Sequence, residues 1–180
     1  MNAHMEALPI IRADTSHVQA IVDLEGRSFS PTDRFSRKTW RHLLGPANHN
    51  GTSITLVAVD VGKVVGSINV LIRSNSRNVR IYSLAVDPAM RGRGLGGLLM
   101  RALCAHVPKR YEAFTLEVRS DNKSARSLYE RLGFTVDRLL PGYYPDGADG
   151  TRYRVTWKQL SSTSPQTSDK RTIPSQRQDT

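Results

Sequence analysis

A glycine-rich segment in the middle of the chain, Arg91–Gly97, constrains the fold more than any other feature of the sequence. It follows the apolar run Ser83–Pro88 and precedes a helical pattern, so it is expected to join a strand to a helix. Glycines let a ligand approach the backbone closely, and the amides of a first helical turn have no acceptor inside their own helix. The helix dipole favours an anion at the same place. We therefore expect this segment, the glycine loop, to bind a phosphate group.

The helix after the glycine loop is predicted from the spacing of its apolar residues. Apolar side chains recur at intervals of three and four residues from Leu95 to Leu103, and the pattern ends before Pro108. The loop lacks the Lys-Ser/Thr ending of a Walker loop, and its glycines do not have the spacing of the dinucleotide fingerprint. Its own pattern is Arg-x-x-Gly-x-Gly.

This pattern resembles the signature of the GNAT acyltransferases, Arg/Gln-x-x-Gly-x-Gly/Ala, which follows a strand similar to Leu84–Pro88. Later motifs are most similar to those of the bacterial enzymes that acetylate the N-terminal alanine of a ribosomal protein. These motifs are Leu-Glu-Val-Arg (116–119), Leu-Tyr-Glu (128–130), Leu-Gly-Phe (132–134) and Tyr-Tyr-Pro (143–145). The resemblance covers residues 8–158, with specific motifs over 82–145, whereas residues 34–50 show no clear match.

The resemblance implies a single-domain α/β fold over residues 8–158, with helices flanking a mixed central sheet that contains a splayed strand pair. The sequence itself predicts an amphipathic helix over 15–29 and a shorter helix capped by Ser36. Alternation predicts strands over residues 54–59, 64–72, 79–86, 114–118, 134–138 and 151–157. Asn122 is expected to cap another short helix. Residues 161–180 are rich in Ser, Thr and Gln, which predicts a disordered tail.

The resemblance further implies that the chain binds acetyl-CoA. In such proteins the pantetheine arm enters the splayed strand pair and pairs with the strand backbone, while the loop holds the diphosphate. The residues implied in cofactor binding are Leu84, Ala85, Val86, Arg91, Gly92, Arg93, Gly94, Leu95, Gly96, Gly97 and Asn122. The two loop arginines supply countercharge to phosphates. Asn122 is both a predicted helix cap and an implied cofactor contact.

Two residues are candidates for acid–base chemistry. A protonated primary amine has no lone pair and must lose its proton before it can attack a thioester, and the departing thiolate must gain a proton. By resemblance Glu117 is the base, directly or through water, and Tyr129, twelve residues later, is the acid. The alternatives are that Glu117 is an outward-facing strand carboxylate and that Tyr129 is a core aromatic residue on its helix face.

The resemblance also assigns Tyr143 and Tyr144 to the lining of the acceptor site. Pro141, Gly142 and Pro145 are equally consistent with a rigid surface turn at this place. Substrate lining and a purely structural turn therefore both remain open for the tyrosine pair.

The leading hypothesis for function is transfer of acetyl from acetyl-CoA to the α-amino group of a protein N-terminus, by direct attack in a ternary complex. A ribosomal protein is one possible acceptor. The first alternative is acetylation of a lysine or small amine on the same scaffold. The second is a noncatalytic module that binds an acyl-CoA.

Composition limits other classes of function. The net charge of +10 suits phosphate binding near the glycine loop, and direct nucleic-acid binding is a weaker hypothesis. The single cysteine, Cys104, and five histidines without ligand spacing predict no metal site and no intramolecular disulfide. With neither a signal peptide nor a long apolar run, the chain is expected to be cytoplasmic and not to bind membranes.

Overall fold

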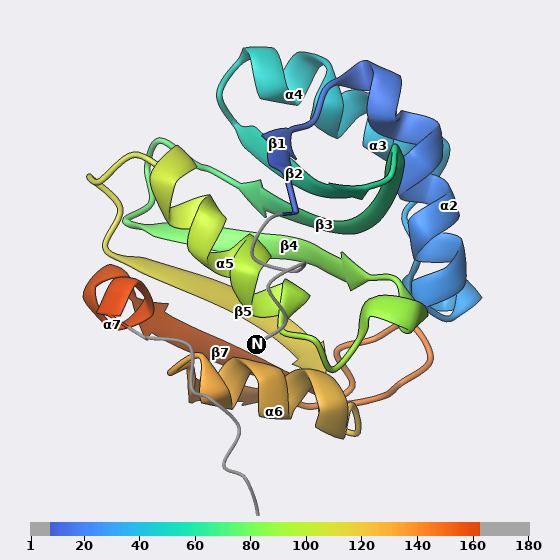
Figure 1. Cartoon of the computed structure of the whole chain (residues 1–180). Coiled ribbons are helices and arrows are strands. Elements are labelled where there is room, and N and C mark those ends of the chain that lie inside the picture. Colours follow the sequence, from blue (N-terminus) through green and yellow to red (C-terminus); the bar gives the residue numbers. More distant parts are fainter. Residues whose placement is uncertain (1–7, 163–180) are drawn as a thin grey trace, which may run out of the picture.

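The computed structural model describes residues 8–162, which form a seven-stranded mixed sheet in the order β1-β2-β3-β4-β5-β7-β6 (Figure 1). The strands are β1 (Ile10–Arg12), β2 (Ser53–Asp60), β3 (Lys63–Leu71), β4 (Asn78–Val86), β5 (Ala113–Arg119), β6 (Thr135–Leu140) and β7 (Gly150–Thr156). The α-helices are α2 (Val18–Ser28), α3 (Arg37–Leu44), α4 (Pro46–His49), α5 (Leu95–His106), α6 (Lys123–Arg131) and α7 (Trp157–Ser162). Three short 3-10 turns are η1 (Thr15–His17), η2 (Pro31–Asp33) and η3 (Pro88–Met90).

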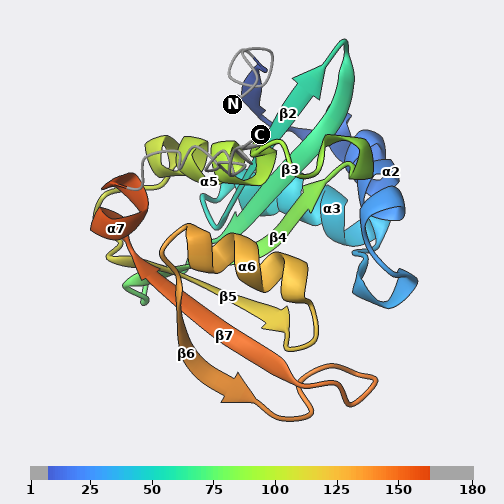
Figure 2. The ribbon, with the colours of Figure 1, turned by 60° about the horizontal axis from the view of Figure 1, so that its bottom comes forward.

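Helices cover both faces of the sheet (Figures 1 and 2). The larger core lies on the face of α5 and α6, where fully buried Leu99 and Leu103 of α5 meet Leu56 and Phe114 of the sheet. The smaller core lies under α2 and α3 on the opposite face, around Trp40. On this second face, α2 and α3 pack on β2, β3 and β4. The same face of β5, β7 and β6 has no helix on it.

The two helix caps predicted from the sequence are confirmed. The Ser36 hydroxyl accepts a hydrogen bond from the Thr39 amide at 3.0 Å, and the Asn122 side chain accepts one from the Ala125 amide at 3.0 Å. The structure adds β1, α4 and α7, which are absent from the sequence prediction. These elements are only three to six residues long, which is too short to show a helical or strand periodicity of apolar residues.

The carboxyl end of the domain contains α7, which packs through Leu160 into the larger core. Ser161 and Ser162, the first residues of the predicted tail, belong to this helix. The rest of that tail lies outside the described residues. None of the described helices is both long enough and apolar enough to span a membrane.

The splayed strand pair of the prediction is β4 and β5. These parallel strands pair at three positions, Asn78–Ala113, Val79–Phe114 and Arg80–Thr115, and the pairing stops there. Figure 2 shows the two arrows diverging toward their carboxyl ends. On its other edge β4 stays paired with β3, where a register shift leaves Tyr82 as an extra residue between Ile81 and Ser83. The opening between the two strands, the β4–β5 wedge, begins beside Arg80.

Candidate active site

The glycine loop has the backbone geometry that the sequence predicts. Gly92 and Gly94 adopt left-handed conformations with φ of 73° and 86°, which other residues adopt only with strain. The first hydrogen bond of α5 runs from the Leu98 amide to the Gly94 carbonyl at 3.1 Å, so the preceding amides have no intrahelical acceptor. A Cβ added at Gly92 or Gly94 would meet nothing within 4 Å. An anion therefore has open access to the N-terminus of α5.

The last two glycines of the loop have a packing role as well. Gly96 and Gly97 are buried, and a Cβ at Gly96 would lie 3.1 Å from the Leu128 side chain of α6. A Cβ at Gly97 would lie 3.6 Å from Leu132. These glycines let α5 and α6 approach closely, so their place in the motif has a structural cause in addition to the predicted cofactor contact.

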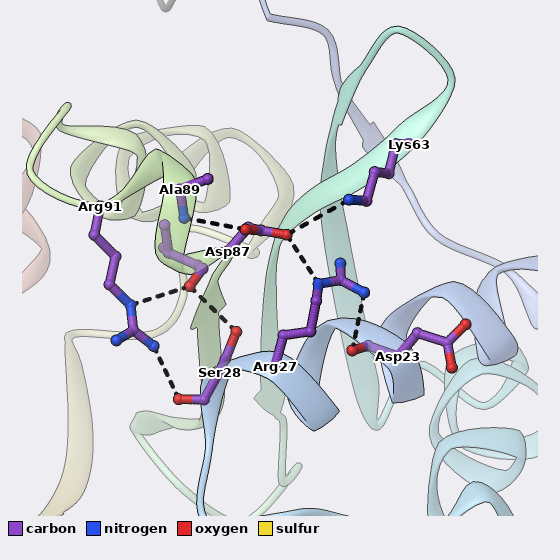
Figure 3. Close-up of polar contacts among 8 residues, drawn as sticks. Asp23, Arg27, Ser28, Lys63, Asp87, Ala89 and Arg91 are labelled. Carbon is purple, nitrogen blue, oxygen red and sulfur yellow. Dashed lines mark hydrogen bonds and ion pairs between the residues drawn. The ribbon is translucent and has the colours of Figure 1, made fainter.

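Arg91 binds main-chain carbonyls in this structure (Figure 3). Its guanidinium donates to the Ser28 carbonyl at 2.9 Å and to the Val86 carbonyl at 3.3 Å. The Ser28 hydroxyl donates to the same Val86 carbonyl at 3.2 Å. Arg91 thus connects the glycine loop to the end of α2, and its side chain remains exposed to solvent. The Val86 carbonyl already accepts two hydrogen bonds.

An ion-pair network beside Arg91 fixes the turn that leads into the loop (Figure 3). The Asp87 carboxylate accepts from the Ala89 amide at 3.1 Å and from Arg27 at 3.0 Å, and Lys63 lies 4.0 Å away. These hydrogen bonds and cations hold the pKa of Asp87 below its usual value against the opposing effect of burial. The network anchors the carboxyl end of β4.

Glu117 lies next to the start of the wedge, held between two arginines. Its side chain is 5% exposed, and its oxygens accept from Arg80 at 2.8 Å and from Arg152 at 2.9 Å. The neighbouring β5 residues Leu116 and Val118 point into the larger core, so Glu117 faces the side of the sheet that no helix covers. Glu117 is thus an outward-facing strand carboxylate that is nearly buried in an ion-pair cluster.

The tyrosine pair of the β6–β7 loop lies beside this cluster. Arg80, which binds Glu117, also donates to the Tyr143 hydroxyl at 3.0 Å. The rings of Tyr143 and Tyr144 meet edge to face with centroids 5.2 Å apart, and the Arg119 guanidinium lies 4.5 Å from the Tyr144 centroid. Burial raises the pKa of Tyr144 to about 12. The structure therefore brings Glu117 and Tyr143 together through Arg80.

Arg119 joins two loops that flank this part of the sheet. It binds Asp33 of η2 at 3.4 Å and Asp146 of the β6–β7 loop at 2.5 Å. Its side chain is 17% exposed. Arg119 thus connects the segment between α2 and α3 to the loop that carries the tyrosine pair.

Tyr129 approaches from the other face of the sheet. It lies on α6, is 9% exposed, and packs edge to face on Phe134 with centroids 5.6 Å apart. Burial, with a smaller contribution from Tyr144, raises the pKa of Tyr129 above its ordinary value of 10. Among residues 8–162 its hydroxyl has no hydrogen-bond partner. Tyr129 is therefore a core aromatic residue whose hydroxyl keeps its proton at neutral pH.

Sequence reasoning missed Glu25, a buried carboxylate on α2. Its oxygens accept from the Phe35 amide, the Trp40 indole and the Ser83 hydroxyl, each at 3.0 Å. Burial raises the pKa of Glu25 in spite of these hydrogen bonds. In the predicted helix, Glu25 occupies a position on the apolar face where an apolar residue is expected. This mismatch is the only signal of its role that the sequence contains. Glu25 fixes the segment between α2 and α3 against β4.

Replacing Glu25 by alanine is expected to lower the free energy of unfolding by about 2–4 kcal/mol, because the buried donors of Phe35 and Trp40 lose their acceptor. Glu25→Gln is the matched control, since its amide oxygen can accept both donors while its nitrogen donates to Ser83. Urea unfolding of both variants measures the difference. Equal losses in the two variants would contradict this role of the hydrogen bonds.

Comparison with known proteins agrees with this geometry. The sequence matches the acetyltransferase (GNAT) family over residues 18–134. The chain belongs to the GNAT acetyltransferase family. It is similar to the N-alpha-acetyltransferase RimI of Mycobacterium tuberculosis, with 32% identity over 158 residues that cover 86% of this chain and 96% of that protein.

A second relative is larger than this chain. N-alpha-acetyltransferase 30 of Xenopus laevis is 32% identical over 128 residues, which cover 69% of this chain and 45% of that protein. The chain thus spans less than half the length of that relative. Among solved structures, the ribosomal-protein-S18-alanine N-acetyltransferase of Escherichia coli superposes with a TM-score of 0.70 at 25% identity, over 88% of this chain and 97% of that one.

Proposed function

We propose that this protein transfers acetyl from acetyl-CoA to the α-amino group of a protein N-terminus. The observation that supports this most is the arrangement at the β4–β5 wedge. A loop suited to phosphate lies at its open end, Tyr129 lies on one face, and Glu117 with the tyrosine pair lies on the other. The similarity to RimI, over 96% of that protein, supports the α-amine as acceptor.

Acetyl-CoA supplies an activated acetyl thioester, and the described residues fit its parts. The open amides before Leu98 suit a diphosphate, and the exposed charges of Arg91 and Arg93 suit the same group. The unpaired edge of β4 over residues 81–86 offers backbone groups to the amides of the pantetheine arm. Leu84 turns its backbone groups toward this edge, whereas those of Ala85 face β3 and the Val86 carbonyl is already engaged.

In the proposed reaction the amine nitrogen bonds to the acetyl carbon and the bond from that carbon to sulfur breaks. The proton that the amine gives up passes to Glu117 through a water, because both Glu117 oxygens already accept from arginines. The sulfur takes a proton from the free hydroxyl of Tyr129. An α-amino group has a pKa of about 7.7–8.0 against about 10.4 for lysine, so it needs less help from a base near neutral pH.

The acceptor class is tested by mass spectrometry of products after incubation with acetyl-CoA. The panel contains peptides that begin with Ala or Ser, peptides with a blocked N-terminus and a free lysine, and polyamines. Because the E. coli structural neighbour is named for the alanine of ribosomal protein S18, a ribosomal-protein N-terminus belongs in the panel. Acetate on a free peptide N-terminus is the expected result. Acetate only on lysine or polyamine would contradict the proposed acceptor, and acetyl-CoA binding without any product would indicate a binding module.

Gly94→Ala is expected to raise the KM for acetyl-CoA about tenfold with little change in kcat. The substitution strains a left-handed residue by about 1–2 kcal/mol and adds a methyl group at the open N-terminus of α5. Gly51→Ala is the matched control, because Gly51 also has a positive φ of 68° and open space, but lies in the turn before β2. Steady-state kinetics of both variants measure the effect. An unchanged KM in Gly94→Ala would show that the loop does not hold the cofactor.

A further inference from the structure

The uncovered face of the sheet contains a strongly basic pocket. Its volume is about 420 Å³, and it is bounded by the β3–β4 hairpin and by β4, β5, β6 and β7. Five arginines line it, Arg73, Arg80, Arg138, Arg152 and Arg154. The only carboxylates in its lining are Glu117 and Asp137. We call it the arginine pocket.

The charges in the arginine pocket are not balanced. Glu117 is shared by Arg80 and Arg152, as described above. Within residues 8–162, no ion pair joins a carboxylate to the side chain of Arg73, Arg138 or Arg154. Three guanidinium groups thus face a concave surface with Asp137 as the remaining counterion. A concave surface of one sign concentrates the potential and attracts anions.

The pocket adjoins the place where the proposed reaction occurs. Arg80 and Thr115, the last residues at which β4 and β5 pair, both line it, and so does Glu117. On β7, Arg152 is opposite Glu117 and Arg154 is opposite Thr115. Alternate residues of a strand lie about 7 Å apart. Arg154 is therefore about 7 Å along β7 from Arg152, the residue opposite Glu117. Arg154 is therefore within reach of the first few residues of an acceptor whose amine lies at Glu117.

We propose that the acceptor is an acidic one, with an aspartate or glutamate side chain in the first few residues after the reacting amine. This inference rests on the proposed function. Arg154, Arg138 and Arg73 bind that carboxylate, and a guanidinium forms strong charge-assisted hydrogen bonds with it. The same charges repel a polyamine. The arginine pocket thus selects among N-termini, while the wedge provides the acetyl transfer.

The test compares peptides that differ only in charge. Peptides that begin with Ala or Ser contain Asp or Glu at the second, third or fourth position, and their partners contain Asn or Gln there. The expected kcat/KM is about tenfold or more higher for an acidic peptide than for its neutral partner. Raising the salt concentration shrinks this ratio because the attraction is screened. Arg154→Gln and Arg138→Gln are expected to bring the ratio toward one.

The matched control is Arg77→Gln, which removes an exposed arginine of the same hairpin that pairs with Glu112 outside the pocket. It is expected to leave the acidic-to-neutral ratio unchanged, and thermal unfolding of each variant confirms that it is folded. Acetylation of both peptide series at equal rates would overturn the inference and leave the proposed function standing. Failure to acetylate any peptide N-terminus would overturn both.

Discussion

Replacing Glu117 by glutamine is expected to lower kcat for the proposed α-amine acetylation by about a hundredfold or more, the range in which general base catalysis contributes. The substitution removes the negative charge that accepts the amine proton in the proposed reaction, and the side chain keeps its size. The expected loss is largest below the α-amine pKa of about 7.7–8.0, where most of the acceptor is protonated. It shrinks as the pH rises above that value, because more of the acceptor then binds with its lone pair already free.

The pH dependence separates a base from a purely structural carboxylate. Glu117 also holds Arg80 and Arg152, so removing its charge disrupts two part-buried ion pairs and lowers stability as well. A variant that is only misfolded or misaligned loses activity equally at every pH. Stopped assays between pH 6 and 9.5, with unfolding measured in parallel, distinguish the two cases. Glu112→Gln makes the same charge change in an exposed ion pair just before β5 and is expected to have wild-type activity. A pH-independent loss in Glu117→Gln would contradict its role as base.

Tyr129→Phe is expected to lower kcat by about a hundredfold while the KM for acetyl-CoA changes little. The variant removes only a hydroxyl that has no partner among the described residues, so its ring still packs on Phe134. Tyr111→Phe is a suitable control, because Tyr111 is also buried, at 2% exposed, and its hydroxyl contacts Arg110 in the turn before β5. Full activity in Tyr129→Phe would remove the tyrosine from the mechanism.

The raised pKa of Tyr129 gives a second test of the same role. A proton donor with an ordinary tyrosine pKa would lose its proton near pH 10, and kcat would fall there. Burial of Tyr129 moves this loss to higher pH. The wild-type rate is therefore expected to rise as the acceptor amine loses its proton and to stay level up to pH 10. A decline centred at or below pH 10 would contradict the assignment.

The sequence predicts well those features that depend on neighbours along the chain. The glycine loop, the helix after it and the caps at Ser36 and Asn122 each depend on a few consecutive residues, and all are confirmed. The splayed strand pair is predicted by the family resemblance. It is confirmed because β4 and β5 pair at only three positions and then diverge. Local chemistry and motif likeness together thus predict the half of the site that would hold the cofactor.

The acceptor side of the site depends on strand register, which the sequence does not reveal. Arg80, Glu117 and Arg152 lie on three different strands and meet only because β4, β5 and β7 are aligned as they are. Alternation along the strand predicts that Glu117 points away from the core. Nothing in the nearby sequence indicates which arginines bind it. The role of Glu25 is not predictable from the sequence for a similar reason, since its three hydrogen-bond donors come from other segments of the chain.

The most direct test of the proposed function is a competition within one molecule. A peptide with a free N-terminal alanine and an internal lysine is incubated with acetyl-CoA and this protein, and fragment-ion mass spectrometry locates the acetyl group. The expected result is acetylation at the α-amine, with the lysine left unmodified at early times. Acetyl on the lysine with a free N-terminus would contradict it.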